Sequence, residues 1–456
     1  MTILSTLSDN IDYLFDSDIL KTGVDDVDIK NCKCGKEHLT SIKNIIIGSG
    51  VIEKLPEELN KLGVKKAFIL TDKNEYEAAG NKVVLLLEKA GVEYEIHIFE
   101  EEKPEPDEYS VGSAVMHFDN SCDAVVAVGS GVVNDIGKIL ANISQKLYII
   151  VATAPSMDGY ASSTSSMSVD GLKASVNSKC ADIIIGDTDI LKNAPINMLK
   201  AGIGDMLAKY ISICEWRISN LITGEYYCET VADLVRQALK KCTDNADKLL
   251  KRSEKAVEAV FEGLIIGGVA MSYVGVSRPA SGVEHYFSHI WDMRGLGFGT
   301  RVDLHGIQCA VATLLVVRLY EKLKNIVPDK EKALKYAKSF DLENWNNELR
   351  AFLGKGAEAM ILLEEKEGKY NLEKHEERLN RIIGNWDGIL EIINEELPDV
   401  QNIEKLLGVI DISVDCDEYR IDKKVLPMTF KATKDIRDKY VLSRLCWDLG
   451  IIDEMF

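Results

Sequence analysis

The feature that most constrains the fold is a regular alternation of short apolar runs with helical stretches across the first 190 residues. The apolar runs are rich in Val and Ile and mostly continuous, as is typical of strands buried on both faces of a sheet. They predict strands at Asn44–Gly48, Ala67–Thr71, Glu95–Phe99, Ala124–Val128, Tyr148–Ala152 and Ile183–Gly186. The stretches between them predict helices at Val51–Leu62, Glu75–Ala90, Glu108–Phe118 and Asn134–Ile143. This order indicates a parallel α/β sheet.

The pattern changes at two points along the chain. A short antiparallel ribbon is expected at Ser162–Val176, because Asp170-Gly171 between two runs of β character favours a tight hairpin. After about residue 190 the strand signals nearly stop and long helical periodicities follow. These periodicities predict helices at Asn197–Leu221, Tyr226–Lys240, Ser253–Tyr273, Glu284–Asp292 and Leu304–Leu323.

The length and the change of pattern predict two domains. A chain of 456 residues is too long for one compact core. We expect an α/β domain over residues 1–190 and a helical domain over residues 191–456. The stretch Asn325–Leu406 is rich in Lys and Glu with interspersed Leu, Ile and Trp, which is typical of solvated amphipathic helices.

Composition argues against several classes of protein. The formal net charge is −19, and an acidic surface repels nucleic acid and anionic lipid. No apolar run reaches about 18 residues without a charge, so no membrane-spanning helix is expected. The N-terminus lacks the basic region and the cleavage site of a signal peptide. The ten cysteines are scattered and several lie in apolar context, which indicates buried thiols and a cytoplasmic protein.

A glycine-rich turn follows the predicted strand Ala124–Val128. The glycines of Gly129-Ser130-Gly131 let a ligand approach the backbone closely, and the next helix presents its first N–H groups to a phosphate. The turn differs from the G-x-G-x-x-G fingerprint because Asn134 occupies the third glycine position. A tight connection between strand and helix is an equally good interpretation.

Two further polar segments follow predicted strands. Asp72 ends one strand, where an acid can bind a ribose hydroxyl and favours NAD over NADP, or can cap the following helix. The loop Thr153–Ser162 ends another strand, at the edge where ligands bind in open α/β sheets. Its hydroxyl groups at Thr153, Ser156 and Ser162 are candidates for cofactor contacts. The carboxylate of Asp158 is a candidate for substrate hydroxyls. The alternative is a local turn without a ligand.

The helical half supplies candidate metal ligands. Only seven histidines occur, and three of them fall within His285–His305. His285 and His289 lie one helical turn apart on one face, and Asp205 lies near the start of another helix. One carboxylate and two imidazoles, from Asp205, His285 and His305, satisfy a divalent metal and leave positions open for a substrate oxygen.

A second candidate metal group lies near the N-terminus, at Cys32, Cys34 and His38. Two thiols and an imidazole are suitable zinc ligands. No fourth ligand is evident from the sequence, and the spacing matches no standard zinc module. A loop with a turn at Cys34-Gly35 is therefore the favoured interpretation.

At these residues the chain resembles the sn-glycerol-1-phosphate dehydrogenases of the iron-containing alcohol dehydrogenase and dehydroquinate synthase-like superfamily. The resemblance spans most of the chain, and the combination of TAPSMDGYAS with SRPASGVEH is its most specific part. The remaining matching motifs are CKCGKEH, GSGVVNDIGK, AGIGDMLAKY, LHGIQCAVAT and IRDKYVLSRLCWDLG.

The resemblance implies a nucleotide-binding α/β domain, a helical domain and an active site in the cleft between them. It implies one divalent metal, zinc, nickel or iron, held by Asp205, His285 and His305. It implies substrate contacts from Asp158 and His289. It implies that NAD or NADP is bound by Asp72, Gly131, Val132, Val133, Asn134, Asp135, Thr153, Ala154, Pro155, Ser156 and Ser162.

The expected reaction is hydride transfer that interconverts dihydroxyacetone phosphate and sn-glycerol 1-phosphate. A small phosphorylated substrate and a homodimer are expected, with Arg278, Lys209 and Arg301 as candidates for the substrate phosphate. Three alternatives are a dehydrogenase for glycerol or another polyol, a lyase of the dehydroquinate synthase kind, and a protein that binds NAD or stores metal without catalysis.

Overall fold

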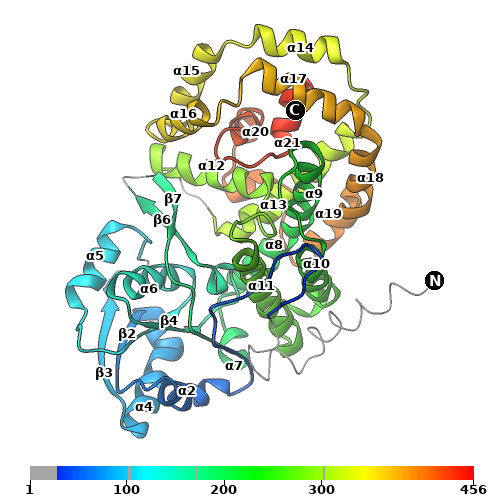
Figure 1. The fold of residues 1–456 in the computed structure, drawn as a ribbon. Coiled ribbons are helices and arrows are strands. Elements are labelled where there is room, and N and C mark those ends of the chain that lie inside the picture. Colours follow the sequence, from blue (N-terminus) through cyan, green and yellow to red (C-terminus); the bar gives the residue numbers. More distant parts are fainter. Residues whose placement is uncertain (1–27, 101–103, 170–171, 301–302) are drawn as a thin grey trace. The chain divides into compact units, whose positions relative to one another are not determined.

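The computed structural model describes residues 28–100, 104–169, 172–300 and 303–456. A six-stranded sheet has the order β1-β8-β5-β4-β2-β3, and every neighbouring pair is parallel. Figure 1 labels three of its neighbouring strands, β3, β2 and β4. Its strands are β1 (Asn44–Gly48), β2 (Lys66–Asp72), β3 (Glu93–Phe99), β4 (Ala124–Gly129), β5 (Leu147–Ala152) and β8 (Ile183–Asp187). The predicted parallel α/β sheet is confirmed, with some strands one or two residues longer than expected.

The helices around the sheet begin and end near their predicted positions, but two of them are composite. The predicted helix Val51–Leu62 opens with a 3-10 turn, and the predicted helix Glu75–Ala90 contains a π turn. The elements are η2 (Val51–Lys54), α2 (Leu55–Lys61), α3 (Lys73–Glu75), η3 (Tyr76–Gly80), α4 (Asn81–Ala90), α5 (Glu108–His117), α6 (Gly131–Ser144), η4 (Gly159–Ala161) and α7 (Thr188–Leu191).

Both faces of the central strands are covered, which explains why β4, β5 and β8 are apolar and mostly buried, whereas the edge strand β3 carries exposed polar residues. One face packs against α2 and α4 through Ile46, Leu59, Ile69, Val83, Leu87, Val126, Val151 and Ile185. Elsewhere two glycines permit a helix to approach the sheet closely, one on helix α6 and one on strand β8. A Cβ on Gly137 of α6 would lie 2.8 Å from Tyr148, and one on Gly186 would lie 2.1 Å from Phe261.

The strand order creates a switch point at the carboxyl ends of β2 and β4. The chain runs from β2 outward to β3, then returns to β4 on the other side of β2 and continues outward to β5. Ligands of open α/β sheets bind at such a point. Asp72 ends β2 and Gly129 ends β4, so both predicted cofactor segments meet there.

The rest of the chain is mainly helical, as expected. The predicted helix Asn197–Leu221 is two helices that meet at Ala208, where Ile211 N donates to Ala208 O (3.0 Å) in a tightened turn. The long helices are α8 (Ile196–Leu207), α9 (Lys209–Thr223), α10 (Glu229–Asp244), α11 (Glu254–Val274), α12 (Val283–Phe298) and α13 (His305–Leu323). Shorter ones follow at α14 (Lys330–Ser339), α15 (Leu342–Leu353), α16 (Gly356–Glu367), α17 (Leu372–Gly384), α18 (Trp386–Glu396), α19 (Val400–Val409), α20 (Leu426–Thr433) and α21 (Leu442–Asp448).

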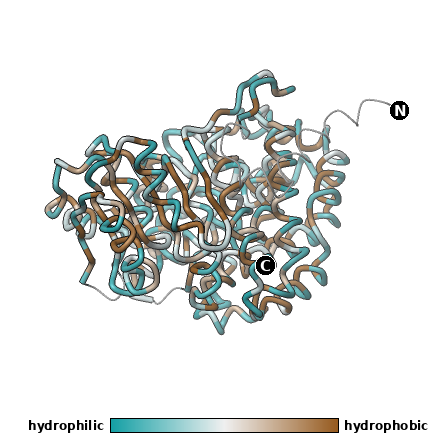
Figure 2. The backbone as a smooth tube through the Cα atoms, turned by 90° about the horizontal axis from the view of Figure 1, so that it is seen from below, coloured by the Kyte–Doolittle hydropathy of each residue, from teal (hydrophilic) through white to brown (hydrophobic). Residues whose placement is uncertain are grey.

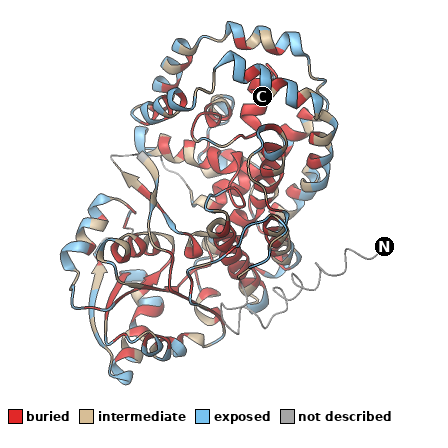
Figure 3. Cartoon of the chain, viewed as in Figure 1, coloured by how far each residue is buried: buried red, intermediate tan, exposed pale blue. Residues whose placement is uncertain are grey.

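The Lys- and Glu-rich stretch forms α14 to α19, and these helices are amphipathic. In Figure 2 hydrophilic and hydrophobic residues alternate along the helices, and in Figure 3 exposed stretches alternate with buried ones along α14 to α17. The buried positions, such as Trp345, Leu379 and Ile393, carry the apolar side chains. The solvated amphipathic interpretation is therefore confirmed for this stretch.

One helix among the described residues, α11, is long and apolar enough to cross a membrane, and 78% of its apolar window is buried inside the protein. The predicted ribbon corresponds to a two-stranded sheet of β6 (Thr164–Val169) and β7 (Leu172–Asn177), while the Asp170-Gly171 turn lies outside the described residues.

The chain divides into two compact units. The first comprises the chain up to Val169 with Ala174–Met206 and Thr230–Val276, and the second comprises Asp170–Lys173, Leu207–Glu229 and Ser277–Phe456. These units follow packing, whereas the predicted boundary between residues 190 and 191 follows the change from α/β to helical sequence. That boundary stays a prediction.

Candidate active site

At the switch point of the first unit, Asp72 is a helix cap. Its Oδ1 accepts a hydrogen bond from Glu75 N (2.8 Å), so the capping role expected as one alternative is present. Asp72 is 8% exposed, and burial raises the pKa of its carboxyl.

Glu75, which sequence reasoning missed, joins the two strand ends. Its carboxylate accepts hydrogen bonds from Ser130 N (2.8 and 2.9 Å) and from Ser130 Oγ (2.6 Å). A Cβ on Gly129 would lie 1.8 Å from Glu75 Oε2, so this glycine permits the approach. Burial and the neighbouring Asp72 raise the pKa of the Glu75 carboxyl to about 8. Its position three residues after a strand end was the only available sequence signal.

Helix α6 begins at Gly131, three residues before its predicted start, because the glycine turn itself forms the first helical turn. Asn134 N donates to Ser130 O (2.9 Å), so the preceding N–H groups at Gly131, Val132 and Val133 come before this first helical hydrogen bond. These N–H groups are the part of the glycine turn that suits an anion.

The side chains of Asn134 and Asp135 bind to the protein itself. Asn134 Nδ2 donates to Gly159 O (3.2 Å), and Asp135 Oδ1 lies 3.0 Å from Lys138 Nζ. Lys138, a buried cation that sequence reasoning missed, also donates to Gly159 O (3.0 Å). Helix α6 therefore fixes the loop after β5 at Gly159.

The loop Thr153–Ser162 lies against helix α8. Tyr160 donates its hydroxyl hydrogen bond to Ala154 O (2.6 Å), and a Cβ on Gly202 of α8 would lie 1.8 Å from Pro155 O. Asp205, also on α8, accepts a hydrogen bond from Asp158 N (2.9 Å) through its Oδ2. Thus the first unit brings together Asp158 and Asp205, two of the predicted site residues.

The hydroxyls of this loop take part in local turns. Thr164 N donates to Ser162 Oγ (3.1 Å), which is the turn expected as the alternative to a ligand contact. Thr153 is buried, and its N–H donates to Gly129 O (3.1 Å). The loop is thus preformed beside the glycine turn.

In the second unit, α12 and α13 pack together and carry the predicted histidines. The ligand atoms of His285, His305 and Cys309 lie within 4.8 Å of one another, and these three residues are named the histidine group here. The rings of His285 and His305 are 5.0 Å apart, and the ring of His289 is 5.8 Å from that of His305. The structure therefore brings the three predicted histidines together.

Neighbouring side chains fix the orientation of two of these imidazoles. His285 Nδ1 lies 2.7 Å from Glu284 Oε1, and His305 Nδ1 lies 2.9 Å from Ser288 Oγ. An imidazole that uses Nδ1 in this way presents Nε2 as its ligand atom, which is the arrangement of metal-binding histidines. Glu284 is fully buried, and its carboxylate also accepts from Gly282 N (2.8 Å).

Cys309 is a member of the histidine group that the sequence reasoning did not include. It lies one turn after His305 on α13, with its Sγ 3.6 Å from His305 Nε2. Burial raises the pKa of the Cys309 thiol, but His285 and His305 outweigh this effect and the pKa lies below its ordinary value. Desolvation, assisted by His305, holds the pKa of His289 well below its ordinary value.

Of the three residues predicted as candidates to bind the substrate phosphate, two are buried and one lies outside the described residues. Arg278 is buried and donates to Glu225 Oε1 (2.8 Å), Tyr440 O (2.9 Å) and Ser219 Oγ (3.1 Å), so its guanidinium serves the fold of the second unit. Lys209 is fully buried. Arg301 lies outside the described residues.

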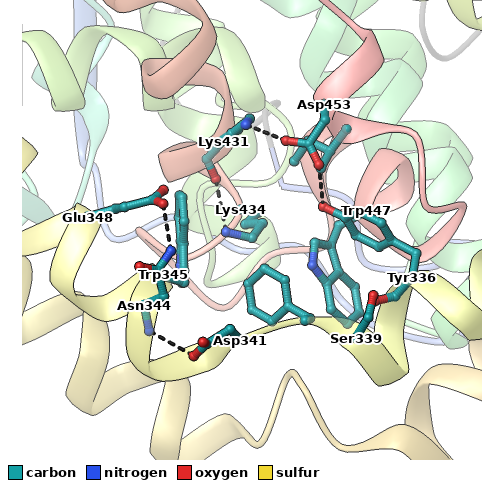
Figure 4. Close-up of a pocket in the computed structure, with 12 residues that line it drawn as sticks. Tyr336, Ser339, Asp341, Asn344, Trp345, Glu348, Lys431, Lys434, Trp447 and Asp453 are labelled. Atoms are coloured by element: carbon teal, nitrogen blue, oxygen red, sulfur yellow. Dashed lines mark hydrogen bonds and ion pairs between the residues drawn. The ribbon is translucent and has the colours of Figure 1, made fainter.

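A hollow of about 230 Å³ lies among the C-terminal helices of the second unit, and none of the described residues predicted for the site lines it. Figure 4 shows the indole of Trp345 beside Lys434, whose Nζ is 3.3 Å from the ring centroid. Asp435 Oδ2 lies 3.0 Å from the same Nζ, so the protein itself satisfies this buried cation.

Comparison with known proteins identifies the family. A sequence model of the iron-containing alcohol dehydrogenase family matches residues 46–195. A glycerol-1-phosphate dehydrogenase (NAD(P)+) of Halalkalibacterium halodurans is 34% identical over 294 residues, which cover 64% of this chain and 74% of the relative. One of Methanosarcina acetivorans is 33% identical over 279 residues, covering 61% and 76%. The chain belongs to the iron-containing alcohol dehydrogenase family, whose chemistry is NAD(P)-dependent oxidoreduction.

Solved structures agree with this assignment at the level of the fold. A 1,3-propanediol oxidoreductase matches with a TM-score of 0.61 and 17% identity, covering 91% of this chain and 98% of its own. A glycerol dehydrogenase of Schizosaccharomyces pombe matches with a TM-score of 0.57 and 18% identity, covering 94% and 92%. Both the sequence resemblance and the predicted fold class are thereby confirmed.

Proposed function

We propose that the protein is a metal-dependent, NAD(P)-linked sn-glycerol-1-phosphate dehydrogenase that interconverts dihydroxyacetone phosphate and sn-glycerol 1-phosphate. Its glycerol-1-phosphate dehydrogenase relatives support this activity at about one-third identity. The single observation that carries the metal dependence is the pair of oriented imidazoles, His285 on Glu284 and His305 on Ser288.

The proposed metal ligands are Asp205, His285 and His305. The donor set of one carboxylate and two neutral imidazoles suits zinc, nickel or iron, and the Nδ1 partners of both histidines fit a metal on the Nε2 side. A divalent cation bound there would supply Lewis acidity for the secondary alcohol and the ketone. Asp158 N, which donates to Asp205 Oδ2, would hold that carboxylate in position.

The proposed cofactor residues are those at the switch point and on the two loops beside it. A bound nicotinamide would supply the hydride donor and acceptor. The N–H groups of Gly131, Val132 and Val133 would bind its phosphates, and Asp72 would bind a ribose hydroxyl with the carboxylate oxygen that does not cap α3. The loop residues Thr153, Ala154, Pro155, Ser156 and Ser162 would line the same side, with Asn134 and Asp135 fixing the loop.

The proposed substrate residues are Asp158 and His289. Because desolvation disfavours the protonated form of His289, a neutral imidazole would be available to hydrogen-bond a substrate hydroxyl or accept its proton. Asp158 would orient a second hydroxyl. We also propose a homodimer in the cytoplasm, since buried thiols such as Cys214 and Cys446 suit a reducing compartment.

The test is oxidation of NADH or NADPH coupled to reduction of dihydroxyacetone phosphate, before and after chelation, followed by metal add-back. We expect activity that disappears on chelation and returns with zinc, nickel or iron. Equal activity before and after complete metal removal would contradict the proposal.

The same assay separates the alternatives. Faster turnover of unphosphorylated glycerol than of sn-glycerol 1-phosphate would indicate a polyol dehydrogenase. Turnover of a substrate without net change in NAD(P)H would indicate a lyase of the dehydroquinate synthase kind. A metal-loaded protein that binds NAD(P)H but turns over neither substrate would indicate a binding or storage function.

A further inference from the structure

Three metal-ligand side chains of the first unit meet in the loop before β1. The ligand atoms of Cys32, Cys34 and His38 lie within 4.8 Å of one another, and Cys34 Sγ is 3.3 Å from His38 Nε2. The family model matches residues 46–195, outside this segment, and the proposed reaction uses none of these residues. They are therefore a second ligand group, separate in the sequence and in ligand type from the histidine group.

The local backbone is shaped to gather these side chains. Ile29 and His38 exchange two backbone hydrogen bonds (2.9 and 3.0 Å), which close the segment between them into a small loop. Gly35 N donates to Cys32 O (3.0 Å), and Gly35 has a φ of 81°, a conformation that glycine adopts without strain. The resulting turn places the thiols on either side of Lys33 near the imidazole.

His38 has the surroundings of a metal ligand. It is fully buried, and its Nδ1 lies 3.5 Å from Tyr273 O, near the end of α11. A histidine that donates from Nδ1 to a backbone carbonyl presents Nε2 as its ligand atom, and this Nε2 is the nitrogen that faces Cys34 Sγ.

The chain itself brings a fourth ligand to this loop. Cys32 Sγ lies 3.4 Å from Thr230 Oγ1, and Cys228 precedes Thr230 by only two residues. Cys228 is 1% exposed and stands directly before Glu229, the first residue of α10. A thiolate is favoured at such a helix start.

We propose that Cys32, Cys34, His38 and Cys228 bind one zinc ion in a closed structural site, the thiolate site. Three thiolates and one imidazole form a tetrahedral ligand set of the kind that selects zinc, with no position left for a substrate. On binding, the three thiols release their protons to solvent while the imidazole binds as the neutral form. No electron is transferred.

The thiolate site would join segments that are distant in sequence. The loop at residues 28–38 precedes β1, whereas His38 contacts the end of α11 and Cys228 stands at the start of α10. A zinc ion there would fix the start of the described chain to both helices, much as a disulfide does in an oxidising compartment.

The first experiment counts metal per chain in the purified full-length protein, supplied with zinc. We expect two equivalents in the wild type, and the loss of one equivalent in Cys34→Ser and in Cys228→Ser. The matched controls Cys122→Ser and Cys416→Ser replace buried cysteines outside the site and should keep both equivalents. His285→Ala should keep the zinc of the thiolate site, so failure of the catalytic metal site is distinguishable from failure of this one.

The second measurement reports the ligand type directly in the wild-type protein. Loading the wild type with Co²⁺ should give an intense thiolate-to-cobalt absorption band that weakens in Cys34→Ser, where two thiolates remain, and persists in Cys309→Ala. A metal content that is unchanged in both Cys34→Ser and Cys228→Ser, or a cobalt band that depends on Cys309 alone, would overturn the proposal.

Discussion

The histidine group and the proposed thiolate site are both compact sets of metal ligands, and they differ in kind. The histidine group offers two imidazoles and the Cys309 thiol on α12 and α13, with side-chain partners that orient each imidazole. The thiolate site offers three thiols and one imidazole, with a backbone carbonyl as the orienting partner. Catalytic sites keep an open position, whereas closed sets of thiolates hold structure. The ligand type and the partner that orients each imidazole therefore distinguish the proposed site for chemistry from the proposed site for folding.

The most severe test of this comparison is His285→Ala. We expect the rate of dihydroxyacetone phosphate reduction to fall at least about 1000-fold, because Lewis-acid stabilisation is worth several kcal/mol. One metal equivalent should be lost while the thermal midpoint stays close to that of the wild type. Cys34→Ser is the counterpart, since it should lower the thermal midpoint and leave the remaining active-site metal in place. Loss of thermal stability in His285→Ala together with loss of activity in Cys34→Ser would contradict the assignment of one catalytic and one structural metal site.

A smaller effect is expected from Glu284→Gln. The amide oxygen still accepts from His285 Nδ1, but the negative charge that strengthens this imidazole as a ligand is removed. Loss of such a partner weakens metal binding about 10- to 100-fold, and we expect the lower end of that range. A chelator competition measures it, with Glu331→Gln on the surface of α14 as the control. An unchanged metal affinity would show that Glu284 serves only the start of α12.

The pH dependence of stability tests the buried carboxyl at the switch point. The pKa of Glu75 rises to about 8 in the folded protein, so the folded state holds a proton that the unfolded state has already lost. The contribution of the Glu75 carboxyl to the free energy of unfolding is therefore complete below the ordinary pKa of a glutamate. It is lost as the pH rises to about 8. Between pH 5 and 8, the free energy of unfolding of Glu75→Gln should therefore fall by roughly 2–5 kcal/mol less than that of the wild type. Chemical denaturation at pH 5 and pH 8 measures these changes. An equal fall in the free energy of unfolding of the wild type and of Glu75→Gln would contradict this assignment.

The smallest expected effects separate the two roles of Asp72. Asp72→Ala should cost about 1 kcal/mol because the cap on Glu75 N is lost, whereas Asp72→Asn keeps a capping oxygen and should be near neutral in stability. If the carboxylate also binds ribose, Asp72→Asn should still raise KM for NADH, about tenfold. Thermal melts measure the change in stability, and steady-state kinetics measure KM for NADH. An unchanged KM would show that Asp72 caps the helix and does not bind the cofactor.

Much of the fold followed from the sequence because its signals are local. The mostly continuous Val and Ile runs predicted six parallel strands, since strands covered on both faces have no polar side to alternate with, and only the edge strand β3 interrupts its run with Glu95 and His97. The breaks within predicted helices were missed, because a π turn at Tyr76–Gly80 and a tightened turn at Ala208 leave the apolar periodicity almost intact.

The candidate sites depended more on contacts between distant residues. Family motifs pointed to the histidines, but the roles of Glu284 and Ser288 became evident only from distances to the imidazoles. Glu75 was missed because strand order, not spacing, brings β2 beside β4. Cys228 was missed because almost 200 residues separate it from Cys32, and only the Cys32–Thr230 contact identifies the segment that it belongs to.

Graded chelation tests the central claim most directly, with metal content, activity and thermal midpoint measured on the same samples of wild-type protein. The open catalytic site should lose its metal first, so activity should vanish with one equivalent while the thermal midpoint stays high. Removal of the second equivalent should then lower the thermal midpoint without further effect on activity. Loss of activity and stability together in a single step, or activity in protein free of metal, would contradict the assignment of one catalytic and one structural site.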